Sequence, residues 1–315
     1  MEKLTFKNGD ELDAIGLGTW KSEPGEVGRA VKAALDTGYR HIDCAAIYGN
    51  EDEIGKALKD WFSGNDVQRK DVWITSKLWN TAHKAEDVIP ALKQTLSDLQ
   101  LHYLDLYLIH WPIAFRPGLE GFPQKDSDYL PLDEVPLTET WEAMLEAKKQ
   151  GLIRHAGVSN FSIKKLKPLI SEYETPEMNQ VEMHPYLQQQ ELLEFCHEHD
   201  IHITSYSPLG SSDRPDQLKR EGEPTLLDND VINKIADKHN ATLAQVLINW
   251  AVERGTTVIP KSTNPGRIKE NFESKDLNLD DEDMEQIKSL DIPFRYLDGS
   301  VFETESDMYR NIFDE

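Results

Sequence analysis

Apolar residues recur along the chain with the spacing of a helix, and short apolar runs separate one such stretch from the next. The first stretch, on Val27, Val31 and Leu35, stops at Gly38, a residue that commonly ends helices. On this pattern we predict strands at residues 39–42, 72–75, 103–109, 153–158, 178–181, 201–205 and 257–259, and helices at residues 27–35, 54–62, 88–99, 137–145, 163–169, 192–195, 231–236 and 243–250, the last opened by a capping box of Thr242 and Gln245.

Strand and helix alternate about eight times, with no linker or change of composition between the units. This order is typical of an α/β protein with a parallel sheet, and eight units favour closure into a (β/α)8 TIM barrel formed by the single domain 1–315. An open, doubly wound sheet is the alternative. The segment 16–20 (GLGTW) disfavours it, because it lacks the third glycine of the fingerprint with which such sheets bind dinucleotides.

Three segments break the rhythm: residues 111–136, residues 208–227 and the tail from about residue 292. They are rich in proline, glycine and charged residues, and long loops within a compact domain are usually functional. In a barrel, we expect them over the carboxyl ends of the strands, where active sites lie.

The net charge of the chain limits the classes of molecule that it can bind. Lys and Arg number 34 against 57 Asp and Glu, which gives a net charge of -23. Such a field repels nucleic acids and anionic membranes. No run reaches the roughly 20 apolar residues of a membrane helix, and the first residues lack the apolar core of a signal peptide. The acidic excess is spread over predicted helices and loops, apart from the local run 280–283, which is typical of a solvated surface. These features predict a soluble, cytoplasmic protein.

The two cysteines, Cys44 and Cys196, do not form a Cys-x-x-Cys pair, so neither a metal nor a redox centre is expected, and a reducing compartment suits them. Residues 196–199 (CHEH) include metal-ligand types. Residues two apart on a helix face different directions, however, so this segment is interpreted as a polar helix end.

Four polar residues follow or close successive predicted strands: Asp43, Tyr48, Lys77 and His110. Each alone has an ordinary explanation, since a strand-end Asp often caps a helix and a loop Tyr often packs. Together they form a coherent acid–base set. A phenol has a pKa near ~10, and an adjacent ammonium can lower it by about one to three units. Lys77 can supply that charge for Tyr48.

The other two residues complete the set. A buried ammonium needs a counter-ion, which Asp43 can provide. His110 can donate a hydrogen bond to a substrate carbonyl while Tyr48 delivers a proton to it. The pattern therefore predicts proton transfer to a carbonyl group.

Long motifs around these residues resemble the aldo-keto reductase superfamily. They are residues 38–51 (GYRHIDCAAIYGNE), residues 104–112 (LDLYLIHWP) and residues 259–262 (IPKS), and the resemblance runs from about residue 4 to 296. It implies that the same four residues are the catalytic tetrad of a carbonyl reductase.

The resemblance also implies a cofactor, NADPH or NADP+. Ser159, Asn160 and Gln180 would hold the nicotinamide carboxamide, and Tyr206 would stack on the ring. Lys261, Ser262 and Arg267 would bind the 2′-phosphate, beside the N-terminus of a helix that begins at Pro265. The complete set of expected cofactor contacts is Gly18, Thr19, Trp20, Asp43, Ser159, Asn160, Gln180, Tyr206, Ser207, Leu209, Ser212, Lys261, Ser262, Thr263, Arg267, Glu270 and Asn271, with Ser207, Leu209 and Ser212 over the pyrophosphate and the last two at the adenine.

Within the superfamily, residues 78–81 (LWNT), 97–101 (SDLQL) and 206–214 (YSPLGSSDR) most resemble the NADP-dependent alcohol dehydrogenases known as aldehyde reductases. The implied substrate is a small carbonyl compound, an aldehyde with apolar bulk. Animal members carry a tail arginine that favours carboxylated aldehydes, and residues 297–302 (LDGSVF) contain none. The expected substrate contacts are Trp20, Tyr48, Trp79, His110 and Trp111.

Two alternatives remain open. A reductase of sugars, ketones or steroids would use the same chemistry. A non-catalytic NADPH-binding protein would belong to another class, and an incomplete tetrad would have favoured it. The resemblance further implies a monomer.

Overall fold

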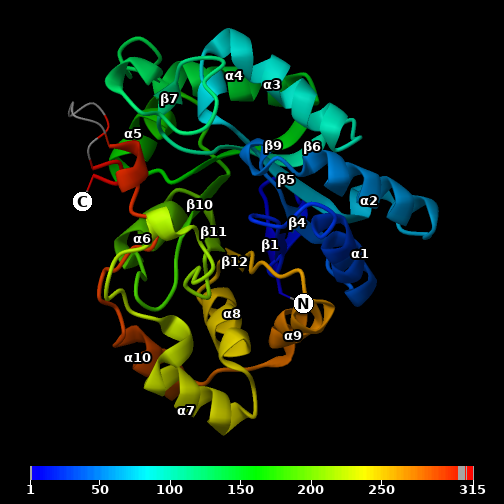
Figure 1. The fold of residues 1–315 in the computed structure, drawn as a ribbon, viewed down its shortest axis with the longest axis vertical. Coiled ribbons are helices and arrows are strands. Elements are labelled where there is room, and N and C mark those ends of the chain that lie inside the picture. The colour runs from blue at the N-terminus through cyan, green and yellow to red at the C-terminus, as the bar shows by residue number, and fades with distance from the viewer. Residues whose placement is uncertain (1, 304–308, 310, 315) are drawn as a thin grey trace.

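Eight parallel strands form a closed barrel in the computed structural model, which describes residues 2–303, 309 and 311–314 (Figure 1). Parallel bridges from Ile15 to Val258 and from Gly18 to Lys261 join the first strand to the last. The predicted (β/α)8 barrel is therefore confirmed. Its strands, in the order of the ring, are β3 (Leu17–Gly18), β4 (His41–Asp43), β5 (Trp73–Leu78), β6 (Leu104–Ile109), β9 (Ile153–Ser159), β10 (Met178–Glu182), β11 (His202–Tyr206) and β12 (Thr257–Val258).

One helix follows each barrel strand and lies on the outside of the ring, with its apolar face against the sheet (Figure 1). None of the helices within the described residues is long and apolar enough to cross a membrane. The eight helices are α1 (Val27–Thr37), α2 (Glu51–Ser63), α3 (Ala85–Asp98), α4 (Leu137–Lys149), α5 (Ile163–Glu172), α6 (Gln190–Glu198), α8 (Leu243–Glu253) and α9 (Pro265–Glu273), with α7 (Asp230–His239) and α10 (Asp281–Lys288) as additions to the repeat.

Local sequence signals fix several of these ends. Gly38 ends α1 with φ 117°, and its N–H reaches the carbonyls of Ala34 and Leu35. The predicted capping box of Thr242 and Gln245 opens α8.

The acidic run 280–283 forms the beginning of α10 and is not solvated throughout. Asp280 and Asp283 form a second capping box at the start of α10, and Asp283 is fully buried. It accepts hydrogen bonds from Lys238 Nζ at 2.8 Å and His239 Nε2 at 2.6 Å. Asp283 is therefore a buried carboxylate paired with a half-exposed lysine, so the surface on which most of the acidic excess is solvated does not include this residue.

The sequence analysis did not predict two short hairpins, because strands of two or three residues are too short to show an alternation of apolar and polar residues. β1 (Lys3–Thr5) and β2 (Glu11–Asp13) form the first, whose Phe6 and Leu12 pack against Trp73 and Leu106. It closes the amino-terminal end of the barrel. β7 (Ala114–Phe115) and β8 (Tyr129–Leu130) form the second, inside the segment 111–136.

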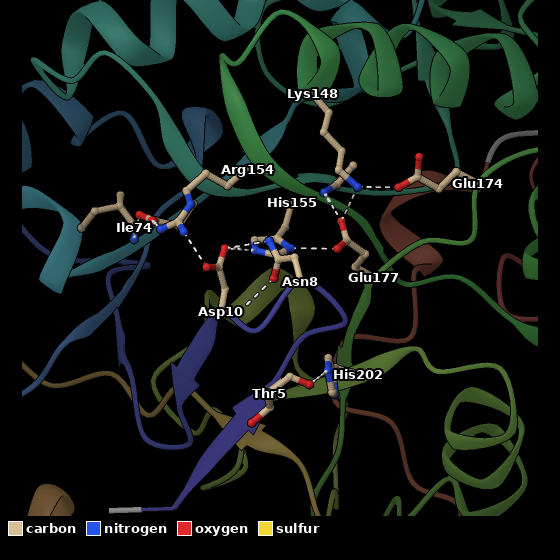
Figure 2. A network of polar contacts seen from close by, with 12 residues as sticks. Thr5, Asn8, Asp10, Ile74, Lys148, Arg154, His155, Glu174, Glu177 and His202 are labelled. Carbon is tan, nitrogen blue, oxygen red and sulfur yellow. Dashed lines mark hydrogen bonds and ion pairs between the residues drawn. The ribbon is translucent and has the colours of Figure 1, made fainter.

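A network of charges fastens the first hairpin to the barrel (Figure 2). His155 of β9 is fully buried, with its Nδ1 2.8 Å from a Glu177 carboxylate oxygen and its Nε2 2.9 Å from one of Asp10. Arg154 also donates to Asp10, at 2.6 Å. Burial raises the pKa of Asp10, but His155 and Arg154 outweigh it, so the pKa lies below its usual value.

Replacing Asp10 by Asn should lower the free energy of unfolding at pH 7 by about 2 kcal/mol, since hydrogen bonds to charged groups contribute about 1.5–3 kcal/mol. Because the pKa of Asp10 is lowered in the folded state, this contribution is complete above the unfolded value of about 4 and is lost as the pH falls through the folded value. In urea denaturation, the difference between variant and parent should therefore shrink in acid.

Glu11→Gln is the matched control. Glu11 lies on the same hairpin and forms an exposed ion pair with Lys3 at 2.8 Å, which contributes less than about 1 kcal/mol. Equal losses of stability in the two variants would contradict the fastening role of Asp10.

Candidate active site

A cavity of about 610 Å³ opens at the carboxyl ends of the barrel strands. All three segments that break the repeat contribute to its wall, and they come from distant parts of the sequence. The first supplies Trp111 and Phe122, the second Leu209 and Asp213, and the tail Phe302. The predicted position of these segments over the carboxyl ends is therefore confirmed.

Lys77 and Asp43 form a buried ion pair beneath this cavity. Asp43 is the last residue of β4, and Lys77 lies near the end of the neighbouring β5. The Lys77 ammonium donates to Asp43 Oδ1 and, at 2.9 Å, to the carbonyl of Cys44. Gln180 Nε2 donates to the other carboxylate oxygen at 2.8 Å. Burial lowers the pKa of Lys77, but the charge and hydrogen bond of Asp43, together with the neighbouring Tyr48, outweigh it, and the net shift is upward. Lys77 is therefore a stable cation.

Tyr48 lies beside this cation. It ends a 3-10 turn, η1 (Ala46–Tyr48), and the following Gly49 has φ 66°. The Lys77 Nζ is 5.3 Å from the centre of the phenol ring. The charge and hydrogen bonding of Lys77 lower the pKa of Tyr48, but burial raises it more, to about 12. The expectation of a pKa below the ordinary value was therefore wrong for the protein alone, because removal of the phenolate from water outweighs the nearby cation. Tyr48 is a protonated donor at neutral pH.

His110 faces Tyr48 across the floor of the cavity. It follows β6, and its backbone N–H bonds to the carbonyl of Leu78 at 3.1 Å. The centres of the His110 and Tyr48 rings are 6.0 Å apart. Burial, together with the positive charge of Lys77, holds the pKa of His110 well below its usual value. The ring is therefore neutral, with one N–H available as a hydrogen-bond donor.

Amide and hydroxyl groups continue this polar floor toward β10 and β11. Ser159 Oγ donates to the carbonyl of Gln180 at 2.8 Å, and Tyr206 donates its hydroxyl to Asn160 Oδ1 at 2.7 Å. Asn160 Nδ2 in turn donates to the carbonyl of His110 at 2.9 Å. These four predicted carboxamide and ring contacts therefore lie together, and hydrogen bonds link them to Asp43 and His110.

The far end of the cavity is basic. Lys261, Ser262, Thr263 and Arg267 border it at the beginning of α9, whose N-cap is Asn264. Within the described part of the chain, the guanidinium of Arg267 has neither an ion-pair partner nor a hydrogen-bond acceptor. Cations, hydroxyl groups and a helix N-terminus are together suited to an anion such as phosphate.

Most of the other predicted contacts line the same cavity, namely Gly18, Thr19, Trp20, Trp79, Trp111, Ser207, Leu209 and Ser212. Glu270 and Asn271 do not. Glu270 accepts a hydrogen bond from Thr242 Oγ1 at 3.0 Å, and Asn271 is buried within α9. Their assignment to the adenine stays a prediction.

The sequence analysis did not predict a pair of ionic contacts that Asp213 makes at the cavity. Asp213, in the segment after β11, lies 3.5 Å from Lys261 Nζ and 3.9 Å from Lys21 Nζ. Nothing in the local sequence distinguishes Asp213 from the many other acidic residues. Its partners come from the opposite end of the sequence and from the segment after β12, so only the fold brings the three together.

Comparison with known proteins agrees with this geometry. Residues 14–292 match the model of the Aldo/keto reductase family. The chain is 49% identical over 318 residues to Aldo/keto reductase slr0942 of Synechocystis sp., covering 100% of this chain and 97% of that protein. It is 47% identical over 296 residues to human Aldo-keto reductase family 1 member A1, covering 93% and 90%. Among solved structures, the aldose reductase from Schistosoma japonicum is similar with a TM-score of 0.86 at 38% identity, covering 98% of this chain and 100% of that one.

Proposed function

The chain belongs to the aldo/keto reductase family, and we propose that it reduces aldehydes to alcohols with NADPH as the hydride donor. The observation that carries the proposal is the arrangement of Tyr48, Lys77 and His110 on the floor of a cavity. The floor can protonate a carbonyl oxygen, and the basic far end can hold a phosphate-bearing cofactor. When bound, NADPH supplies the hydride that adds to the carbonyl carbon.

The side chains divide the proton chemistry among them. His110, as a neutral donor, orients the carbonyl through a hydrogen bond to its oxygen. Tyr48 gives its hydroxyl proton to that oxygen as negative charge develops there. A phenol with a pKa of about 12 is still a stronger acid than an alcohol, so this transfer is downhill. Lys77 stabilises the phenolate that remains, and Asp43 keeps Lys77 charged and in place.

Replacing Tyr48 by Phe removes the proton donor and leaves the shape of the cavity nearly unchanged. We expect kcat for aldehyde reduction to fall by about 10² to 10⁴, the usual contribution of general acid catalysis. NADPH binding, measured by fluorescence titration, should stay within about twofold, because equal binding with lost turnover marks a group that acts in the transition state. Full activity of the variant would refute the mechanism. Binding of NADPH with no turnover by the parent protein, for any aldehyde, would favour the non-catalytic alternative.

The basic end of the cavity supports NADPH over NADH. The two cofactors differ by a 2′-phosphate, which needs cations or strong donors. Lys261 is partly engaged with Asp213, whereas the Arg267 guanidinium has no acceptor within the described residues. Arg267 is therefore the group best placed to select for the extra phosphate.

Replacing Arg267 by Met should weaken NADPH binding by about 10- to 100-fold, as expected for the loss of a charge-assisted hydrogen bond of about 1.5–3 kcal/mol. Binding of NADH should change by less than about twofold, because it lacks the phosphate. Lys269→Met is the control, since Lys269 is an exposed cation of the same helix that pairs with Glu273 at 3.7 Å. Equal losses for both cofactors, or for both variants, would contradict the assignment.

The wall of the cavity supports neutral aldehydes with apolar bulk as substrates. Trp20, Trp79, Trp111 and Phe302 surround the space above Tyr48. The described lining includes Asp298, which pairs with Arg220 at 3.2 Å, and its cations, Lys261 and Arg267, belong to the cofactor end. Outside that end, the described lining therefore offers a carboxylated substrate no lysine or arginine, in a protein whose net charge is -23.

A matched pair of substrates tests this preference. We expect kcat/KM for benzaldehyde to exceed that for 4-carboxybenzaldehyde by at least about tenfold, equivalent to about 1.4 kcal/mol of repulsion. Asp298→Asn should reduce the ratio, and so should a higher salt concentration, because salt screens exposed charges. A preference for the carboxylated aldehyde would overturn the proposal. Higher rates with sugars, ketones or steroids would favour the related reductases.

We further propose that the protein acts as a monomer in the cytoplasm. Both cysteines are buried free thiols, which suits a reducing compartment. The cavity is complete within one chain, so the proposed chemistry needs no residue from a partner.

A further inference from the structure

Two covering segments meet on one side of the cavity. The first, residues 207–224, carries Leu209 and Asp213 to the cofactor side and is named the cofactor loop here. The second, residues 294–298, leads into the tail that lines the substrate side and is named the tail segment. They are about 70 positions or more apart in the sequence, and several side-chain contacts join them.

Arg220 makes the outermost of these contacts. Its guanidinium donates to the carbonyl of Arg295, lies 3.2 Å from the Asp298 carboxylate and is centred 4.5 Å from the Phe294 ring. Its own backbone N–H bonds to the Glu223 carboxylate at 3.2 Å. One side chain of the cofactor loop thus holds a carbonyl, a charge and an aromatic ring of the tail segment.

Tyr296 makes the inner contact. Its hydroxyl donates to the carbonyl of Pro224 at 2.9 Å, and its ring centre lies 5.0 Å from the Arg214 guanidinium. Arg214 is buried and bonds to the carbonyls of Ser211 and Leu218 and to the Glu223 carboxylate, all within the cofactor loop. The loop therefore has an internal frame of its own, and the tail segment packs against that frame.

The tail segment is in turn fixed to the barrel. Glu182 is the last residue of β10 and is fully buried. Its carboxylate accepts the backbone N–H groups of Tyr296 at 2.6 Å and Leu297 at 2.8 Å. It also contacts His184 Nε2 at 2.8 Å. A group that contacts the tail segment is thereby connected to the rigid sheet.

We propose that Arg220 is a positioning residue that fastens the cofactor loop to the tail segment and slows the release of the nucleotide. The inference rests on the proposed function, since it takes NADPH and NADP+ as the molecules that the loop covers. The loop then has two fastenings: Asp213 meets Lys21 and Lys261 on the cofactor side, and Arg220 meets the tail segment on the other. An isolated exposed ion pair contributes little, but Arg220 makes three contacts with a segment that is itself anchored.

Arg220→Gln tests the fastening, with Lys219→Gln as the matched control. Lys219 precedes Arg220 and pairs at 3.0 Å with Asp216 of the same loop. Its replacement by Gln therefore removes the same charge without removing a contact with the tail segment. Dissociation of NADPH and NADP+ is measured by stopped-flow fluorescence. We expect Arg220→Gln to accelerate dissociation by about tenfold or more, the factor that corresponds to about 1.4 kcal/mol, and Lys219→Gln to change it by less than about twofold.

A double-mutant cycle tests whether Asp298 is the residue through which Arg220 acts. Asp298→Asn should also accelerate dissociation, and adding it to Arg220→Gln should produce little further change, because both remove one contact. If Arg220→Gln fails to fold, Arg220→Lys replaces it and should give the same direction, since an ammonium cannot hold the three partners of the planar guanidinium.

Equal dissociation rates in the Arg220 and Lys219 variants would overturn the inference while leaving the proposed function intact, provided the parent binds NADPH and reduces aldehydes. A parent that binds neither nucleotide would instead refute the proposed function. Faster dissociation confined to the Arg220 and Asp298 variants supports the fastening.

Discussion

The buried pair of Lys77 and Asp43 is the interaction on which the rest of the site depends. Removing two charges from water is costly, and it is sustained only where geometry and further hydrogen bonds are favourable. Here the carbonyl of Cys44 and the amide of Gln180 complete the pair, so β4, β5 and β10 all contribute. The pair therefore requires the closed barrel, and the barrel in turn fixes a cation beneath Tyr48.

Opposing electrostatic effects set the protonation states of the side chains on the floor of the cavity. Burial disfavours every charged form, so it raises the pKa of Tyr48 and lowers that of His110. The fixed cation acts against the first effect and reinforces the second. The result is a protonated phenol beside a neutral imidazole, with the one stable positive charge placed to stabilise a phenolate. This is the state from which a proton can be given to a carbonyl oxygen.

The enclosure of the floor comes from segments outside the barrel repeat. Trp111 and Phe302 approach from two of them, with ring centres 4.9 Å apart, and Asp213 crosses the cavity from the third. The cofactor loop and the tail segment also contact each other through Arg220 and Tyr296. The two sides of the cavity are therefore not independent covers, because one anchor at Glu182 supports the tail segment on which the loop rests.

The sequence by itself determined the order of strands and helices, the parallel sheet and the strand-end positions of Asp43, Lys77 and His110, because these follow from periodicity and from the geometry of parallel strands. It favoured a barrel over an open sheet, and the bridges between the first and last strands decided that the sheet closes. The short hairpins carry too few residues for a period, and the burial of Asp283 depends on Lys238 and His239 of another helix. Only the tertiary structure decided the pKa of Tyr48 and the contacts of Asp213 and Arg220. Desolvation and ion pairing depend on neighbours that are distant in sequence, and residue type and spacing do not reveal how deeply a group is buried or which charge it meets.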